Sequence, residues 1–139
     1  MRKTITTLLA LTALTAAGVL ATPALARESA VVRYGQIPAG AYSIVAQVQA
    51  KPGQEAALRE ATLPLVDLVR GDPKNLVYFL QEDRAKPGHF VFYEIFATVE
   101  DFEAHNAMPY VKDWFAKLPA LAEGGVQVTR MEVLGHGRP

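Results

Sequence analysis

The sequence contains no cysteine, and this absence excludes disulfide bonds, thiolate nucleophiles and zinc sites of the cysteine type. An excess of either charge is also lacking, because 14 basic residues stand against 14 acidic ones. This balance argues against binding to nucleic acid or to an anionic membrane surface, both of which require strong positive charge. Histidine is scarce too. His89, His105 and His136 lack the spacing of metal ligands, so no metal site is predicted.

The first 26 residues have the three-part layout of a secretory signal peptide. Basic Arg2 and Lys3 precede an apolar run that reaches Leu20, and the small-residue sequence Ala-Leu-Ala occupies positions 24–26. The apolar run is short and contains several threonines, which favours a cleaved leader over the alternative, a retained membrane anchor. We therefore predict export, to a periplasm or to the medium, with no membrane association after cleavage.

Cleavage after residue 26 leaves 113 of the 139 residues, which is enough for one domain. Residues 27–40 contain Gly35, Pro38 and Gly40 without a clear period, so we interpret them as an N-terminal arm or linker. The domain itself is expected from residue 41 to residue 139. Without disulfides it must be held by its core, alone or together with a partner subunit.

Alternating β-branched and apolar residues predict four strands, and apolar residues at helical spacing predict two helices. Pro64 is expected to kink the first helix, Pro109 to interrupt the second, and Thr98 to cap the second. A turn is expected at Gly124-Gly125, before the last strand. The strands are expected at residues 41–50, 76–83, 89–97 and 126–135, and the helices at residues 54–70 and from Thr98 to about Leu118.

This order, β-α-β-β-α-β, is that of a ferredoxin-like α+β fold, in which an antiparallel sheet carries two helices on one face. The first helix is expected to face the sheet with Leu58, Ala61, Leu65 and Leu68. Both sheet faces are predicted to be buried, because Phe90, Phe92, Glu94 and Phe96 alternate with Val91, Tyr93 and Ile95.

Two helices can cover one face of such a sheet and leave the other. We therefore expect a second copy of the sheet to cover the remaining face, which gives a homodimer of the dimeric α/β barrel type. The alternative is that the arm, residues 27–40, covers this face. The arm contains few large apolar residues, which makes it the poorer cover.

Two segments resemble the motifs of the antibiotic biosynthesis monooxygenase domain family, which includes quinol monooxygenases. RGDPKNLVY at 70–78 is similar to the family's turn Arg-x-Glu-Pro-Gly-x-Leu-x-Tyr, and FVFYEIFATVEDFEAH at 90–105 to its strand, helix cap and Ala-His pair. The resemblance covers residues 42 to 134. The chain departs from the family pattern where Asp72 replaces the usual glutamate, where Lys74-Asn75 replaces a common glycine, and where Tyr110 replaces a frequent histidine.

The resemblance implies a dimer of ferredoxin-like subunits and a cofactor-independent monooxygenase. Its partners are then molecular oxygen and a small electron-rich aromatic, such as a hydroquinone or an anthrone-like polyketide. Other relatives degrade haem with a tryptophan that precedes a histidine. Here His105 precedes Trp114, which argues against haem bound in that geometry.

Oxygenation without a cofactor requires a substrate anion, because a phenolate or carbanion gives an electron to oxygen more readily than the neutral molecule does. The site therefore needs a base, a polar anchor and an apolar pocket. His105 is the candidate base, since it shares a helix face with Phe102; the alternative is a core histidine. Glu94 could orient His105 or pair with Arg130. Asn75 could anchor a substrate oxygen or cap its turn.

The candidate pocket walls are aromatic. Their spacing also fits ordinary core packing, so the sequence does not decide between the two roles. The second candidate function is a non-catalytic protein that binds a small aromatic or haem-like ligand in the same pocket. The candidate walls are Tyr78, Tyr93, Phe96, Tyr110 and Trp114.

Overall fold

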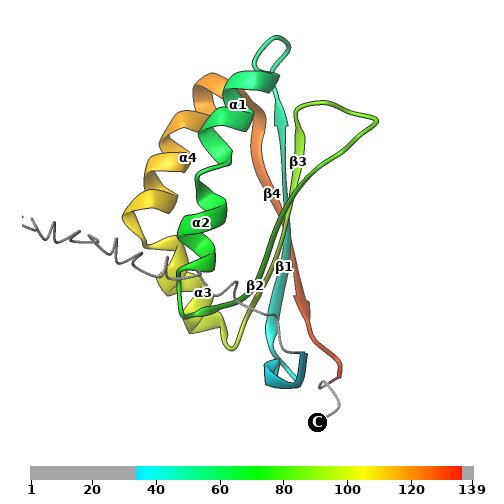
Figure 1. Cartoon of the computed structure of the whole chain (residues 1–139), viewed down its shortest axis with the longest axis vertical. Coiled ribbons are helices and arrows are strands. Elements are labelled where there is room, and N and C mark those ends of the chain that lie inside the picture. Colours follow the sequence, from blue (N-terminus) through cyan, green and yellow to red (C-terminus); the bar gives the residue numbers. More distant parts are fainter. Residues whose placement is uncertain (1–33, 136–139) are drawn as a thin grey trace, which may run out of the picture.

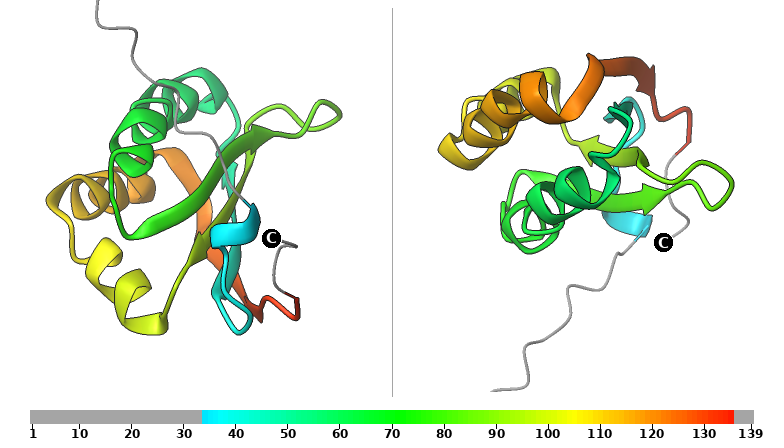
Figure 2. Two further views of the ribbon diagram at one scale, coloured as in Figure 1. Left: turned by 60° about the horizontal axis from the view of Figure 1, so that its bottom comes forward. Right: turned by 90° about the horizontal axis from the view of Figure 1, so that it is seen from above.

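A computed structural model describes residues 34–135, so the predicted leader and residues 27–33 of the arm lie outside the described residues. The described chain forms two layers, a four-stranded sheet and a layer of helices packed against one of its faces (Figures 1 and 2). Within residues 34–135, no helix has both the length and the apolar character needed to span a membrane.

The order of elements confirms the predicted ferredoxin-like arrangement, with each helical segment divided in two. All neighbouring strands are antiparallel, and the sheet order β2-β3-β1-β4 places β1 and β3 in the centre. The elements are a 3-10 turn at Tyr34–Gln36, β1 (Tyr42–Ala50), α1 (Glu55–Thr62), α2 (Leu65–Arg70), β2 (Asn75–Glu82), β3 (His89–Phe96), α3 (Val99–Asn106), α4 (Pro109–Leu121) and β4 (Ala122–Glu132).

Pro64 divides the first helical segment, because proline has no N–H to donate to the preceding turn. The helical stripe that faces the sheet differs from the predicted one. Thr62 is buried in place of Ala61, and Leu68 is 45% exposed. The Thr62 hydroxyl donates to the Leu58 carbonyl at 2.7 Å, which allows a polar side chain to be buried here. The stripe consists of Leu58, Thr62, Leu65 and Val69.

The second helical segment begins at its predicted cap. The Thr98 side-chain oxygen accepts a hydrogen bond from the backbone N–H of Asp101 at 3.2 Å. Pro109 begins α4 as its first residue, where the missing N–H costs nothing, so the interruption falls just before it. The helix continues to Leu121, past the predicted end.

The predicted turn at Gly124-Gly125 is wrong, because both glycines lie inside β4. Their φ angles are 66° and 74°, a region that favours glycine. The register shifts at the same place, since Gln47 of β1 pairs with Gln127 whereas Gln49 pairs with Glu123. The glycines therefore form a β-bulge, and α4 leads directly into β4 at Ala122.

The two faces of the sheet are buried to different degrees. The face toward the helices carries the main core, which includes Phe90, Phe92 and Phe96. On the far face, Ile37 of the arm packs on a small buried cluster at one end of the sheet. Phe79, midway along the edge strand β2 on this face, remains 43% exposed. In the single chain, the expectation that both faces are buried is therefore met only in part, and the homodimer remains a prediction.

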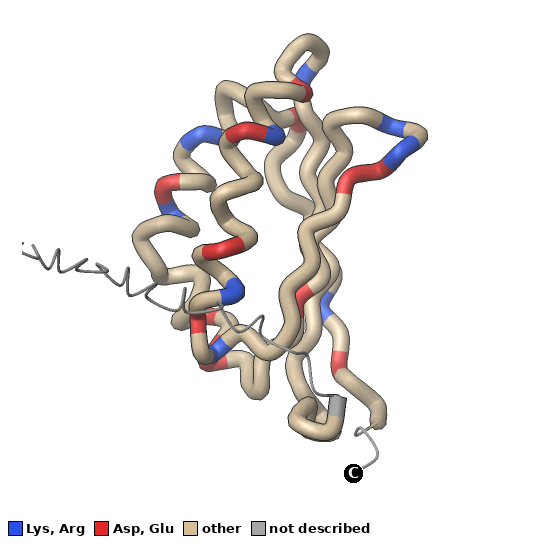
Figure 3. The backbone as a smooth tube through the Cα atoms, in the orientation of Figure 1, with Lys and Arg blue, Asp and Glu red and all other residues tan. Residues whose placement is uncertain are grey.

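Between residues 34 and 135, charged residues of one sign are not concentrated in any part of the backbone. Lysine and arginine alternate with aspartate and glutamate over the helices and at the β2–β3 turn (Figure 3).

Replacement of Phe79 by glutamate tests the predicted homodimer. If a second sheet covers the far face, the wild type sediments at about twice the mass of one chain. Phe79→Glu then sediments as a monomer at micromolar concentration, because a charge buried in an apolar interface costs several kcal/mol. Leu68→Glu is the matched control, since Leu68 is equally exposed but lies on the outer helix face. A wild-type monomer, or equal behaviour of the two variants, contradicts the prediction.

Candidate active site

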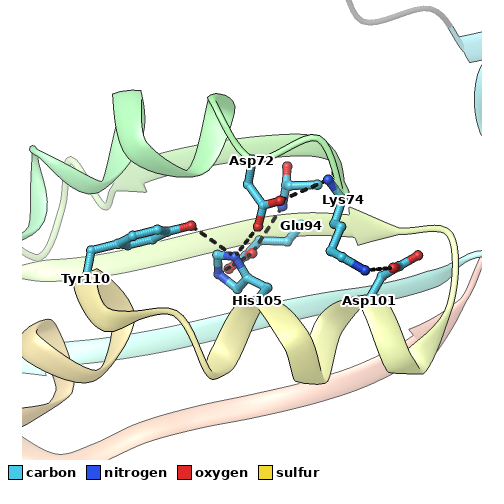
Figure 4. A network of polar contacts seen from close by, with 7 residues as sticks. Asp72, Lys74, Glu94, Asp101, His105 and Tyr110 are labelled. Atoms are coloured by element: carbon cyan, nitrogen blue, oxygen red, sulfur yellow. Dashed lines mark hydrogen bonds and ion pairs between the residues drawn. The ribbon is translucent and has the colours of Figure 1, made fainter.

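Three ionisable side chains meet between the sheet and the helices. Asp72 comes from the turn after α2, Glu94 from the central strand β3, and His105 from α3 (Figure 4). Their side chains are only 6%, 8% and 5% exposed. A buried charge needs hydrogen-bond partners, so the contacts of each group decide its chemistry.

The turn after α2 fixes the position of Asp72. The backbone N–H of Asp72 donates to the Val69 carbonyl at 3.0 Å, and that of Asn75 donates to the Asp72 carbonyl at 3.1 Å. One carboxylate oxygen, Oδ1, accepts from the backbone N–H of Lys74 at 3.0 Å. The other, Oδ2, lies 3.2 Å from Nδ1 of His105. Both oxygens are therefore engaged, and the carboxylate is held in one orientation.

The contacts of His105 assign the proton on its ring. Asp72 Oδ2 can only accept when ionised, so Nδ1 carries the hydrogen and donates it. The Tyr110 hydroxyl lies 3.4 Å from the same nitrogen. Nε2 then has a free lone pair, which faces Oε2 of Glu94 at 3.7 Å. His105 thus presents its accepting nitrogen to the second carboxyl group.

A shift in strand register brings Asn75 to Glu94. The pairing of β2 with β3 shifts between Asn75 and Val77, so Asn75 pairs with Phe96 and lies on the same face as Glu94. Its amide donates to Glu94 Oε2 at 3.3 Å. Asn75 therefore positions the carboxyl group.

Burial shifts the pKa values of Glu94 and His105 in opposite directions. Loss of water raises the pKa of Glu94 from 4.5 to about 7. Burial also lowers the pKa of His105 below 6.5, although the hydrogen bond and charge of Asp72 partly oppose this. Near neutral pH, His105 is therefore uncharged, and Glu94 exchanges its proton readily. A carboxyl group with a pKa near neutrality beside an uncharged imidazole is suited to accepting and returning a proton.

A pocket adjoins this cluster and is lined mainly by apolar side chains. Its volume is about 60 Å³. An apolar cavity of about 150 Å³ holds benzene, so an aromatic ligand requires the pocket to widen. Phe115 is the largest of the partly exposed lining residues and marks its mouth. The polar lining residues are Tyr78, Glu94, His105 and Asn106, and the apolar ones include Ile44, Leu65, Val69, Phe92, Phe102 and Trp114.

Four of the eight predicted site residues line the pocket, and three others support it. Its wall includes Tyr78, Glu94, His105 and Trp114. Asn75 contacts Glu94, and Tyr110 contacts His105. Phe96 is fully buried and packs on the His105 ring at 5.3 Å between centroids. The indole N–H of Trp114 already donates to Thr62 Oγ1 at 3.0 Å.

Tyr93 is the exception, because the prediction that it lines the pocket is wrong. It lies on the far face, because side chains alternate along β3 and those of Phe92 and Glu94 point to the helices. Glu94 also does not pair with Arg130, which was the alternative partner. Arg130 is exposed, and Glu94 contacts Asn75 and His105 instead.

Sequence reasoning missed Asp72 as the partner of His105. The available signal was its place in the 70–78 motif, where a carboxylate is retained although its side chain is one methylene shorter than the family's glutamate. Within residues 34–135, no group of three or more histidine, cysteine, aspartate or glutamate side chains is arranged to hold a metal ion. The reason lies in the cluster itself, since His105 stands between the two carboxyl groups and they do not converge on one point.

The family model for antibiotic biosynthesis monooxygenases matches residues 41–117. A structure from Shewanella oneidensis is 26% identical, with a TM-score of 0.63 over 70% of this chain and 94% of that one. Another, described as an antibiotic biosynthesis monooxygenase, is 27% identical, with a TM-score of 0.61 over 65% and 95%. A Nitrosomonas europaea protein of unknown function, 22% identical with a TM-score of 0.63 over 72% and 95%, shows the shared fold alone. No curated protein matches the sequence.

The raised pKa of Glu94 predicts how Glu94→Gln changes stability with pH. Protonated Glu94 contributes stability that is fully present below pH 4.5 and is lost as the pH rises through about 7. Glutamine cannot ionise, so the variant does not lose this stability. Its free energy of unfolding should rise relative to that of the wild type by up to about 3 kcal/mol between about pH 4.5 and about pH 8.5.

Denaturant unfolding of both proteins across this range measures the difference. Glu103→Gln, on the exposed side of α3, is the control for loss of one charge, because its side chain stays in water in both states. The same pH-independent difference for both variants would contradict the assignment of a buried, proton-binding Glu94.

Proposed function

Since the chain belongs to the antibiotic biosynthesis monooxygenase family, we propose that it is a cofactor-independent monooxygenase that oxidises a quinol or a related phenolic aromatic with molecular oxygen. The observation that supports this most is the buried, uncharged His105, whose Nδ1 is held by Asp72 and whose Nε2 is free beside an apolar pocket. A base in this setting can remove the proton that keeps a phenol unreactive toward oxygen.

In the proposed reaction, Nε2 of His105 takes the hydroxyl proton of the substrate. Asp72 stabilises the imidazolium that forms, since it already accepts from Nδ1. The phenolate gives electrons to oxygen, and one oxygen atom is added to the ring. One quinol and one O₂ then give one hydroxyquinone and one water, so atoms and electrons balance without an external reductant. The apolar walls exclude water from the reacting anion.

Oxygen uptake tests the proposal directly. Metal-free protein is mixed with a panel of hydroquinones and phenols in an oxygen electrode, and the product is analysed after reaction in ¹⁸O₂. We expect one O₂ consumed for each quinol, with one labelled atom in the product. Simple two-electron oxidation would instead release hydrogen peroxide and leave the product unlabelled. Tight binding of an aromatic without oxygen uptake would assign the pocket to ligand binding alone.

His105→Gln should lower turnover by about 10²–10⁴-fold, the usual contribution of a positioned acid–base group. Glutamine keeps a polar side chain between the carboxyl groups but cannot accept a proton at neutral pH. His89→Gln is the matched control, because His89 lies in β3 away from the pocket. Activity per folded molecule and the melting temperature are measured on the same preparations. Unchanged activity with a lowered melting temperature would make His105 a core residue only.

The pH profile provides a second measure of the same base. Because burial lowers the pKa of His105, the acid limb of kcat/KM should lie below pH 6.5, with activity rising as the ring loses its proton. This limb should be absent in His105→Gln. A limb that persists in the variant would assign the titrating base to another group, with Glu94 the first candidate.

We also propose that the protein acts outside the cytoplasm, on the basis of residues 1–26. Mass spectrometry of the exported protein should then find a chain that begins at Arg27. An intact leader on the exported protein would contradict this proposal.

A further inference from the structure

Tyr78 lines the pocket, and its buried hydroxyl has no hydrogen-bond partner within residues 34–135. The residue is 5% exposed, and it stands directly opposite Glu94 in the β2–β3 pair. Three other residues also have a buried polar atom without a partner in this part of the chain. They do not line this pocket: Ser43, Gln49 and His89.

The ring of Tyr78 is explained by packing, but its hydroxyl is not. The ring lies 6.4 Å from that of Phe92, and a phenylalanine would make the same contact. A buried hydroxyl without a partner destabilises the folded protein, because it has left its hydrogen bonds with water. A group kept at such a cost beside a pocket is suited to a hydrogen bond with a bound molecule.

Near pH 7 the hydroxyl is neutral, so it keeps a hydrogen that it can donate. Burial, followed by the neighbouring Glu94, raises the pKa of Tyr78 far above its ordinary value of 10.0, so the proton stays on the oxygen. The remaining polar groups of the pocket differ in this respect. The pKa of Glu94 is raised to about 7, that of His105 is lowered by burial, and Asn106 is partly exposed.

We propose that the Tyr78 hydroxyl donates a hydrogen bond to a second oxygen of the aromatic ligand, and so selects ligands with two oxygens over simple phenols. This inference rests on the proposed function, which assigns the first oxygen to His105. The two anchoring points come from different elements, β2 and α3, with Glu94 on β3 beside both. A ligand held at both oxygens is fixed in its rotation within the apolar walls, which a single hydrogen bond does not achieve.

Binding of matched phenols tests this role without turnover. Methoxyphenols and ethylphenols have nearly the same shape, but only the methoxy group contains an oxygen that can accept from Tyr78. The ortho, meta and para isomers of each are titrated under nitrogen. The signal is the fluorescence of Trp114, the sole tryptophan of the chain and a residue of the pocket wall. At one ring position, the wild type should bind the methoxyphenol about 3- to 10-fold more tightly than the ethylphenol.

Tyr78→Phe should abolish this preference and leave ethylphenol binding unchanged or slightly stronger. The same variant should melt a few degrees higher than the wild type without ligand, since it removes an unsatisfied buried hydroxyl. Tyr93→Phe is the control, because it removes a hydroxyl from the far face. A preference that is absent in the wild type, or that survives in Tyr78→Phe, overturns the inference.

The oxygen electrode separates failure of this inference from failure of the proposed function. Oxygen uptake together with an unchanged preference in Tyr78→Phe overturns the role of Tyr78 alone. Loss of the preference without oxygen uptake by any quinol supports the role of Tyr78 and overturns the monooxygenase. If none of the phenols binds to the wild type, both are overturned.

Discussion

The hydrogen bond between Asp72 and His105 is the interaction on which the chemistry of this pocket depends. It joins the turn after α2 to α3, two segments that lie 33 positions apart and belong to different halves of the fold. It decides which ring nitrogen carries the proton, and therefore which one is free. Without it, burial alone would disfavour the charged ring still further, and an imidazolium formed during proton transfer would have no ionised partner at Nδ1.

The rest of the site can be understood as support for this pair. Asn75 reaches Glu94 because the register of β2 shifts, and Phe96 packs against the histidine ring from the sheet. Thr62 accepts the indole N–H of Trp114, so that side chain needs no ligand to be satisfied. Tyr78 is different, since its hydroxyl has no such partner in the described chain. The small volume of the pocket adds a constraint, because an aromatic ligand has to displace wall residues. Phe115, which is 44% exposed, is the most exposed of these residues.

Local patterns are enough to predict the order of strands and helices along the chain, the Thr98 cap and the shared face of Phe102 and His105. Contacts that depend on register were not predictable in this way. The pair Gly124-Gly125 predicts a turn from sequence, because glycine pairs occur in turns and in bulges and only the pairing with β1 identifies the bulge. The sequence does not show which face Tyr93 occupies, because both faces of β3 are apolar and the face toward the helices is fixed by packing of the whole domain. Asp72 was noticed only as a departure from a motif, since nothing local to the 70–78 turn indicates that α3 presents a histidine to it.

The protonation state of His105 tests the account most directly. The chain has three histidines, so ¹⁵N-labelled imidazole signals can be assigned by comparison with His105→Gln. A titration of the long-range ¹H–¹⁵N correlations then gives both the tautomer and the pKa of this ring. The account predicts a neutral ring with the proton on Nδ1 at pH 7 and a pKa below 6.5. A ring that is charged at pH 7, or one with its proton on Nε2, would contradict the assignment of His105 as the base.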